Sequence, residues 1–317
     1  MKAIKRKFNK IMAEFRNFRY LMRALRNLSN PQYIFDLQLI HQLKLNKDWS
    51  ERNSQRQLMD LYASKVGITD QKKVFEAKEY KIFTQNGEDG ILLYIFSLIG
   101  IKTGKFVDFG CGGFSHNTAN LVINFNWSGL YIGGTDEAIR ETKDFFSERI
   151  GERINTLQIQ KQWITKDNIN SIIENAGLKG TIDLLSVDID SSDYWIWEAI
   201  NVISPNVVLV EYNASFGPYK SVTVPYKFDF DPYEYNVKKW YHGASLQAMT
   251  KLGKQKGYSL VYCDSNGVNA FFVKTALLLE DSLKEMTPEI AYNPHFQREG
   301  PYEEQLAFIS HLPVIEI

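Results

Sequence analysis

A glycine-rich turn at residues 107–113 is the sharpest chemical signal in the chain. It reads Val-Asp-Phe-Gly-Cys-Gly-Gly and ends a short apolar run that predicts a β-strand. Glycines at such a place let the backbone turn tightly and approach a ligand closely. We therefore expect Asp108, Gly110 and Gly112 to contact a cofactor. The alternative is a tight strand-to-helix turn that holds no ligand.

The residue that should hold the ribose of a nucleoside cofactor is missing. In such folds an acidic residue follows about 20 positions after the glycine turn, at the end of the second strand. This chain has Gly133 there, and Asp136 and Glu137 come just after it. We assign the ribose role to Asp136 from the following turn.

Polar side chains also follow the predicted fourth and fifth strands. Asp188 and Asp190 come directly after the fourth, while Glu211 and Asn213 end the fifth. In a parallel α/β sheet, ligands bind beyond the carboxyl ends of the strands. Asp188 and Asp190 share a face by the two-residue period, and with Asn213 they form a candidate Mg²⁺ site. The alternative is no metal, with one aspartate capping the next helix and another binding substrate.

A long aromatic loop, residues 216–241, separates the fifth strand from the next helix. Loops of this length above a sheet often cover substrates, and aromatic rings suit sugar faces. We expect Glu211, Asn213, Tyr226 and Tyr241 to bind substrate. His242 follows the loop and is a candidate general base; the alternative is a role in capping the helix or packing the loop.

Alternating strands and helices must position these residues. Apolar runs at 105–109, 129–132, 156–159, 182–187 and 207–211 are separated by helical windows, which predicts a parallel sheet covered on both faces. Two further strands, 258–263 and 269–274, are joined by a Gly-containing four-residue turn at 264–267 and predict an antiparallel hairpin. The fold class is therefore a doubly wound, Rossmann-like α/β sheet ending in an antiparallel hairpin, with an N-terminal helical extension.

Four segments are expected along the chain: 1–30, 31–78, 79–276 and 277–317. The second is a helical extension, with helices over 33–45 and 50–66. The third is the α/β domain. The fourth is a C-terminal extension, for which we predict a helix over 278–285 and a strand over 312–317.

The chain has no net charge overall, but its charges are unevenly distributed between the first 30 residues and the rest. The 317 residues hold 37 basic and 37 acidic side chains, which argues against a nucleic-acid binder. Residues 1–30, however, carry nine basic residues and one acidic residue, a net charge of +8, so the other 287 carry −8. The apolar residues of this segment fall on one helical stripe. We expect either a helix on an anionic membrane surface or one that packs on the protein or a second copy.

Two cysteines, Cys111 and Cys263, are too few for a disulfide scaffold or a Cys-rich zinc site. No stretch reaches the roughly 18–20 apolar residues that span a bilayer. With no signal peptide recognised, we expect a cytoplasmic protein, peripheral at the inner membrane face if residues 1–30 bind lipid.

The chain resembles FkbM-like methyltransferases, class I S-adenosylmethionine-dependent enzymes, over roughly residues 80–275. The segments that carry the resemblance are 83–90, 126–132, 184–190, 211–213, 222–226, 241–246 and 267–273. They are similar to a subgroup often met among surface-polysaccharide genes. By position, the resemblance places Asp108, Gly110 and Gly112 against the cofactor.

These observations lead to two hypotheses. The first is an S-adenosylmethionine-dependent O-methyltransferase that acts on a glycan or glycolipid precursor at the cytoplasmic membrane face. Asp190 or His242 would then be the catalytic base, Asp188 a cofactor contact and Mg²⁺ a candidate cofactor. The second, motivated by Gly133, is a non-catalytic or differently catalytic protein of the same fold that binds a nucleotide or glycan intermediate, or acts as an assembly partner.

Overall fold

The chain divides into two units, Met1–Glu51 and Arg52–Ile317. The computed structural model describes residues 51–64, 70–112, 115–189, 192–231, 234–235, 238 and 240–317. The expected helices over 1–30 and 33–45 therefore lie outside the described residues, as does Asp190.

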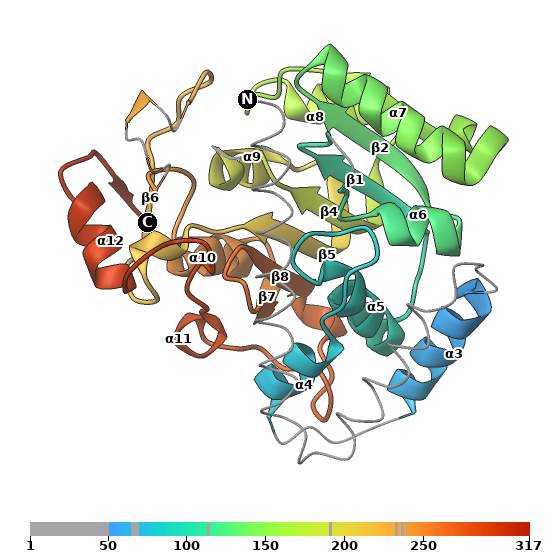
Figure 1. Cartoon of the computed structure of the whole chain (residues 1–317), viewed down its shortest axis with the longest axis horizontal. Coiled ribbons are helices and arrows are strands. Elements are labelled where there is room, and N and C mark those ends of the chain that lie inside the picture. The colour runs from blue at the N-terminus through green and yellow to red at the C-terminus, as the bar shows by residue number, and fades with distance from the viewer. Residues whose placement is uncertain are drawn as a thin grey trace, which may run out of the picture. The chain divides into compact units, whose positions relative to one another are not determined.

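A seven-stranded sheet forms the centre of the second unit (Figure 1). Its strands are β1 (Lys105–Phe109), β2 (Ser128–Gly133), β3 (Leu157–Lys161), β4 (Gly180–Val187), β5 (Ile203–Glu211), β7 (Tyr258–Cys263) and β8 (Asn269–Lys274). Their order is β3-β2-β1-β4-β5-β8-β7. The first five are parallel, whereas β8 is antiparallel to β5 and β7. The predicted parallel sheet with a closing hairpin is confirmed.

Helices cover both faces of this sheet. Those of one face are α8 (Ile169–Asn175), α9 (Asp193–Ala199) and α10 (Leu246–Gln255), which share a core with the strand residues Val107, Leu130 and Val208. Those of the other are α5 (Glu88–Ile99), α6 (Ala119–Phe125) and α7 (Asp136–Ile150). There Phe146 of α7 packs on Tyr131, which packs on Phe106. Alternate strand residues point to opposite faces, so the apolar strands fill both cores.

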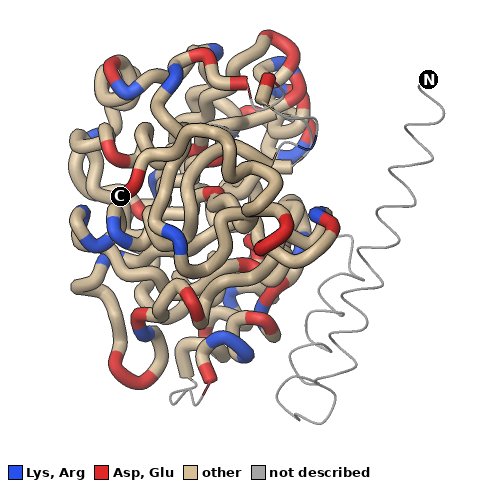
Figure 2. The backbone as a smooth tube through the Cα atoms, turned by 90° about the vertical axis from the view of Figure 1, so that its left-hand side faces the viewer, with Lys and Arg blue, Asp and Glu red and all other residues tan. Residues whose placement is uncertain are grey.

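Among the described residues, two further helices precede α5: α3 (Glu51–Ala63) and α4 (Gln71–Lys78). The first matches the helix predicted over 50–66. Figure 2 shows acidic and basic residues interspersed along the described backbone on the side in view. Within the described ranges, no helix has the length and apolarity needed to cross a membrane.

The C-terminal segment returns to the sheet domain. Residues 278–285 form a turn closed by a bridge between Leu279 and Leu283, so the helix predicted there is wrong. The segment continues through α11 (Pro288–Ala291) and α12 (Tyr302–Ile309). It ends in β9 (Ile315–Glu316), which pairs with β6 (Val222–Thr223) and confirms a strand within 312–317.

A buried carboxylate holds the start of β1 against the sheet. Asp183 is fully buried on β4 and accepts hydrogen bonds from the backbone N–H groups of Thr103 (2.6 Å) and Gly104 (2.7 Å). It also accepts one from the Asn206 amide at 2.8 Å. One side chain thus ties the entry of β1 to β4 and β5.

We predict that Asp183→Ala lowers the free energy of unfolding by about 3 kcal/mol, because several donors lose their acceptor at once. Urea unfolding measures the change. Asp144→Ala, an exposed position on α7, is the matched control and should shift stability by less than about 0.5 kcal/mol. Equal stabilities of the two variants would contradict this assignment.

Candidate functional site

The glycine turn after β1 is fixed by close packing against the loop after β4. Gly110 has φ +81°, and a Cβ there would lie 1.6 Å from the carbonyl oxygen of Asp188. No side chain fits at that separation. A Cβ at Gly112 would lie 3.2 Å from the Cβ of Ala138 in α7. Chain packing therefore requires a glycine at Gly110 and leaves little space at Gly112, and the contact at Gly110 brings Asp188 to the turn.

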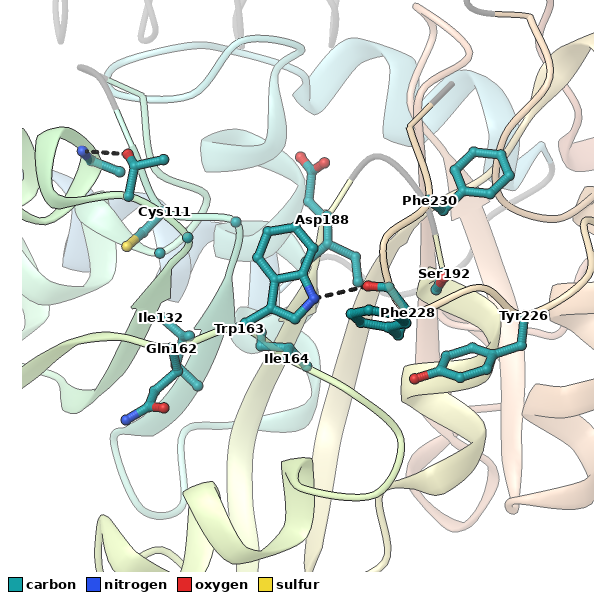
Figure 3. A pocket seen from close by; sticks show the side chains of 16 residues that line it. Cys111, Ile132, Gln162, Trp163, Ile164, Asp188, Ser192, Tyr226, Phe228 and Phe230 are labelled. Atoms are coloured by element: carbon teal, nitrogen blue, oxygen red, sulfur yellow. Dashed lines mark hydrogen bonds between the residues drawn. The ribbon is translucent and has the colours of Figure 1, made fainter. Parts of the chain in front are cut away.

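A cavity of about 280 Å³ lies beyond the carboxyl ends of β1–β4. We call it the aromatic cavity, because Trp163, Tyr226, Phe228 and Phe230 line it. The Trp163 indole N–H donates to the carbonyl oxygen of Phe228 at 2.8 Å, joining the loop after β3 to the loop after β6 (Figure 3). Gly110, Cys111, Gly133 and Asp188 also line it.

The second cavity, about 300 Å³, lies beyond β1, β4 and β5. We call it the acidic cavity. Its carboxylates come from Glu88, Asp108, Asp188 and Glu211. Gly110, Cys111 and Asp188 line both cavities, so the two adjoin at these residues. Among the described residues that line either cavity, none is Lys or Arg.

Asn269, the first residue of β8, adds an open acceptor to the acidic cavity. It pairs with Glu211 in the register of β5 and β8 and is 1 % exposed. Its amide nitrogen donates to Glu88 at 2.8 Å, which fixes the amide orientation. Its Oδ1 atom is buried and has no hydrogen-bond partner among the described residues. Because buried acceptors normally have a donor, a ligand with N–H or O–H groups fits here.

Asp108 lines the acidic cavity at the end of β1. It is 3 % exposed and accepts a hydrogen bond of 2.7 Å from the Thr118 hydroxyl. Burial raises the pKa of Asp108 from 3.8 to about 6, although the hydrogen bonds from Thr118 and Ser186 oppose that shift. Burial thus disfavours the charged form of Asp108, the residue predicted to contact the cofactor.

Gly133, at the end of β2, has no room for the missing ribose carboxylate. A Cβ there would lie 2.9 Å from the carbonyl oxygen of Cys111. Asp136 is exposed, forms an ion pair with Lys161 at 2.6 Å, and lines neither cavity. The structure therefore does not place Asp136 where the ribose role requires it.

His242 is buried beside Glu211, but its basic nitrogen is already engaged. Nε2 lies 2.8 Å from an Arg298 nitrogen, and Nδ1 lies 3.9 Å from Glu211 Oε2. Arginine only donates, so Nε2 accepts and the proton is on Nδ1, facing Glu211. His242 lines neither cavity. The ring therefore links Arg298 to Glu211, whereas the sequence suggested either a general base or a residue that caps the helix or packs the loop.

Asn213 and Tyr241 have internal partners. The Asn213 amide donates to the carbonyl oxygens of Trp240 (2.9 Å) and His242 (2.8 Å), and its Oδ1 accepts from the Ser215 backbone and Arg298. The buried Tyr241 hydroxyl donates to the carbonyl of Pro313. Neither residue lines a cavity. The structure thus uses both to hold the loop and the C-terminal segment.

Tyr226 and Glu211 do lie where a substrate could reach them. Tyr226 lines the aromatic cavity, and Glu211 lines the acidic one. No group of three or more His, Cys, Asp or Glu side chains suited to a metal exists within the described ranges, which leave out Asp190. The expected Mg²⁺ site therefore has no support from Asp188 and Asn213.

Three residues of this site were not predicted from the sequence: Glu88, Asn269 and Arg298. Glu88 lies in the 83–90 segment and Asn269 in the 267–273 segment, so the resemblance pointed to both regions. Nothing near Arg298 in the sequence predicts its contact with His242, which is 56 positions away. Burial lowers the pKa of Arg298 to about 10, and the Glu211 carboxylate opposes that shift.

The strand order, with its antiparallel β8, makes this a methyltransferase-type fold. No protein-family model matches the chain, and no curated protein matches it significantly.

The chain is similar to several solved methyltransferases. An S-adenosylmethionine-dependent methyltransferase from Clostridium acetobutylicum is 12 % identical, with a TM-score of 0.38 over 60 % of this chain and 92 % of that one. The methyltransferase domain of a bacterial Hen1 is 12 % identical, with a TM-score of 0.39 over 58 % and 95 %. An O-methyltransferase family protein from Burkholderia thailandensis is 6 % identical, with a TM-score of 0.37 over 59 % and 57 %. These values are too low to carry activity or substrate to this chain.

The raised pKa of Asp108 predicts a pH dependence of stability. Folding favours the protonated form, so this stabilisation is present below pH 3.8 and is lost as the pH rises through about 6. Asp108→Asn removes the titrating group. The free energy of unfolding of the variant should therefore rise relative to wild type by about 3 kcal/mol between pH 3.8 and 7. Urea titrations at several pH values test this, and parallel stability curves would contradict it.

Proposed function

We propose that this protein binds S-adenosylmethionine across the two adjoining cavities and transfers its methyl group to an acceptor hydroxyl. The observation that carries the proposal is the pair of cavities that meet at Gly110, Cys111 and Asp188. They lie beyond the carboxyl ends of parallel strands, where α/β folds bind ligands. One cavity offers aromatic surface for the adenosine, and the other offers acceptors for the α-ammonium group at the methionine end.

The aromatic cavity suits the adenosine half. Trp163 and Phe228 provide ring faces on which an adenine can stack. Thr135 and Gln162 line the same cavity and offer hydroxyl and amide groups to a ribose. These neutral groups would take the place of the carboxylate that Gly133 cannot provide.

The acidic cavity suits the methionine half. Its carboxylates and the open Oδ1 atom of Asn269 would accept hydrogen bonds from the α-ammonium group. Bound S-adenosylmethionine supplies a methyl group on a positively charged sulfur. The chain's own task is to align the acceptor and to receive its proton.

Candidates for that proton lie at the ends of β4 and β5. Asp190 follows β4 and remains a prediction from the sequence. Glu211 lines the acidic cavity, and the Nδ1–H of His242 faces the Glu211 carboxylate. We assign His242 to positioning and keep proton transfer for a carboxylate.

The acceptor we propose is a hydroxyl of a glycan or glycolipid precursor at the cytoplasmic membrane face. The resemblance to the surface-polysaccharide subgroup supports this class. Two other aromatic side chains that line the aromatic cavity, Tyr226 and Phe230, offer faces that suit sugar rings. The +8 charge of residues 1–30 supports contact with anionic lipid.

Trp163→Ala should weaken S-adenosylmethionine binding about tenfold, because one stacking face is lost. Isothermal titration calorimetry measures the dissociation constant. Tyr219→Ala is the matched control, since this exposed aromatic residue lines neither cavity. Wild-type protein that binds no S-adenosylmethionine at millimolar concentration would refute the proposed function.

Gly133 supports a second candidate, a protein of the same fold that binds a nucleotide or glycan intermediate without methyl transfer. The lack of room for a side chain there is the specific observation. Thermal stabilisation by a nucleotide sugar, without any by S-adenosylmethionine, would favour this candidate.

Membrane contact through residues 1–30 can be tested separately. The full chain should co-sediment with vesicles containing phosphatidylglycerol, and deletion of residues 1–30 should abolish this, because basic residues near an anionic surface contribute about 1 kcal/mol each. Neutral phosphatidylcholine vesicles are the control. Co-sedimentation that survives the deletion would show that another surface binds the lipid.

A further inference from the structure

We infer that the acidic cavity and Asp188 select the cofactor by charge, so that S-adenosylmethionine binds more tightly than its demethylated product. This inference rests on the proposed function and concerns which form of the ligand the site retains. It depends on three features: the charge of the lining, the open acceptor of Asn269, and the position of Asp188.

The lining of the acidic cavity has four carboxylates and one histidine, His116, but no Lys or Arg among its described residues. Its carboxylates are those of Glu88, Asp108, Asp188 and Glu211. Arg298 does not line this cavity; its guanidinium bonds to His242, and its charge interacts with the Glu211 carboxylate. A site of this composition attracts cationic ligands and repels anionic ones.

Asn269 supplies independent evidence that a hydrogen-bond donor belongs in this cavity. Its side chain is 99 % buried, and its Oδ1 atom has no hydrogen-bond partner among the described residues. The amide cannot turn around without losing the 2.8 Å bond from its nitrogen to Glu88. An ammonium group would provide the donor and the positive charge together.

Asp188 lies at the junction of the two cavities. It lines both, and Figure 3 shows its side chain rising between Cys111 and Phe230. The sulfur of the ligand joins the ribose to the methionine chain. A ligand with its adenosine in one cavity and its methionine in the other therefore has its sulfur near this junction, where Asp188 is the carboxylate common to both cavities.

Loss of the methyl group removes the positive charge of the sulfur. The ligand then changes from a net charge of +1 to zero, and its attraction to Asp188 at the junction is lost. At the separations typical of a ligand contact, such an attraction in a partly solvated site is of the order of a tenfold change in affinity, or 1.4 kcal/mol. The site therefore retains the reactant and releases the product.

The test is calorimetry on the full chain with S-adenosylmethionine and S-adenosylhomocysteine. We expect the first to bind wild type about tenfold more tightly, and the ratio to shrink at high salt. Asp188→Asn should reduce the ratio severalfold by weakening S-adenosylmethionine alone. Asp144→Asn, an exposed carboxylate on α7, is the matched control and should keep the wild-type ratio.

A wild-type ratio of one or less, or an unchanged ratio in Asp188→Asn, would overturn the inference while leaving the proposed function intact. If neither ligand binds wild type, the proposed function itself fails. Sinefungin, which carries an amine-bearing carbon in place of the sulfur, gives a check that needs no variant. It should bind wild type at least as tightly as S-adenosylmethionine, and binding no tighter than the product would contradict charge selection.

Discussion

The close approach of Gly110 to the backbone of Asp188 is the constraint on which the site depends. The loops after β1 and β4 touch there. A Cβ on residue 110 would lie 1.6 Å from the carbonyl oxygen of Asp188, and φ is positive at this residue, so only glycine fits. Since β1 and β4 are neighbours, their carboxyl ends already lie together. The glycine turn brings these ends into contact and makes Asp188 part of the wall of both cavities. The glycine turn thus forms part of both cavities and of the place where they adjoin.

Neighbouring side chains from several elements orient the carboxylates of the acidic cavity. Glu88 accepts from Asn86 and Asn269, Asp108 accepts from Thr118, and Glu211 faces His242, which accepts from Arg298. Glu88, Asp108 and Glu211 each face a neutral or basic side chain from another element. Arg298 belongs to the C-terminal segment, so the part of the chain that follows the sheet completes the wall behind β5. The acidic cavity consequently depends on the C-terminal segment being docked.

The order of the elements could be predicted from the sequence, because apolar runs separated by helical windows permit few arrangements. The hairpin of β7 and β8 followed from its four-residue turn. Asp188 and Glu211 both line the acidic cavity, since parallel strands end at one edge of the sheet; the cofactor and substrate roles expected for them stay predictions. The roles of Asn213, Tyr241 and His242 could not be predicted, because they depend on Pro313 and Arg298, which are distant in sequence. The helix expected over 278–285 failed because helical composition did not reveal the turn between Leu279 and Leu283.

The central claim is that one ligand spans both cavities across Asp188. A crystal structure of the protein with S-adenosylmethionine tests it most directly. The account predicts the adenine ring against Trp163, the sulfur at the junction of Gly110, Cys111 and Asp188, and the α-ammonium within hydrogen-bonding distance of Asn269 Oδ1. A ligand confined to one cavity, or one with its adenine in the acidic cavity, would contradict it.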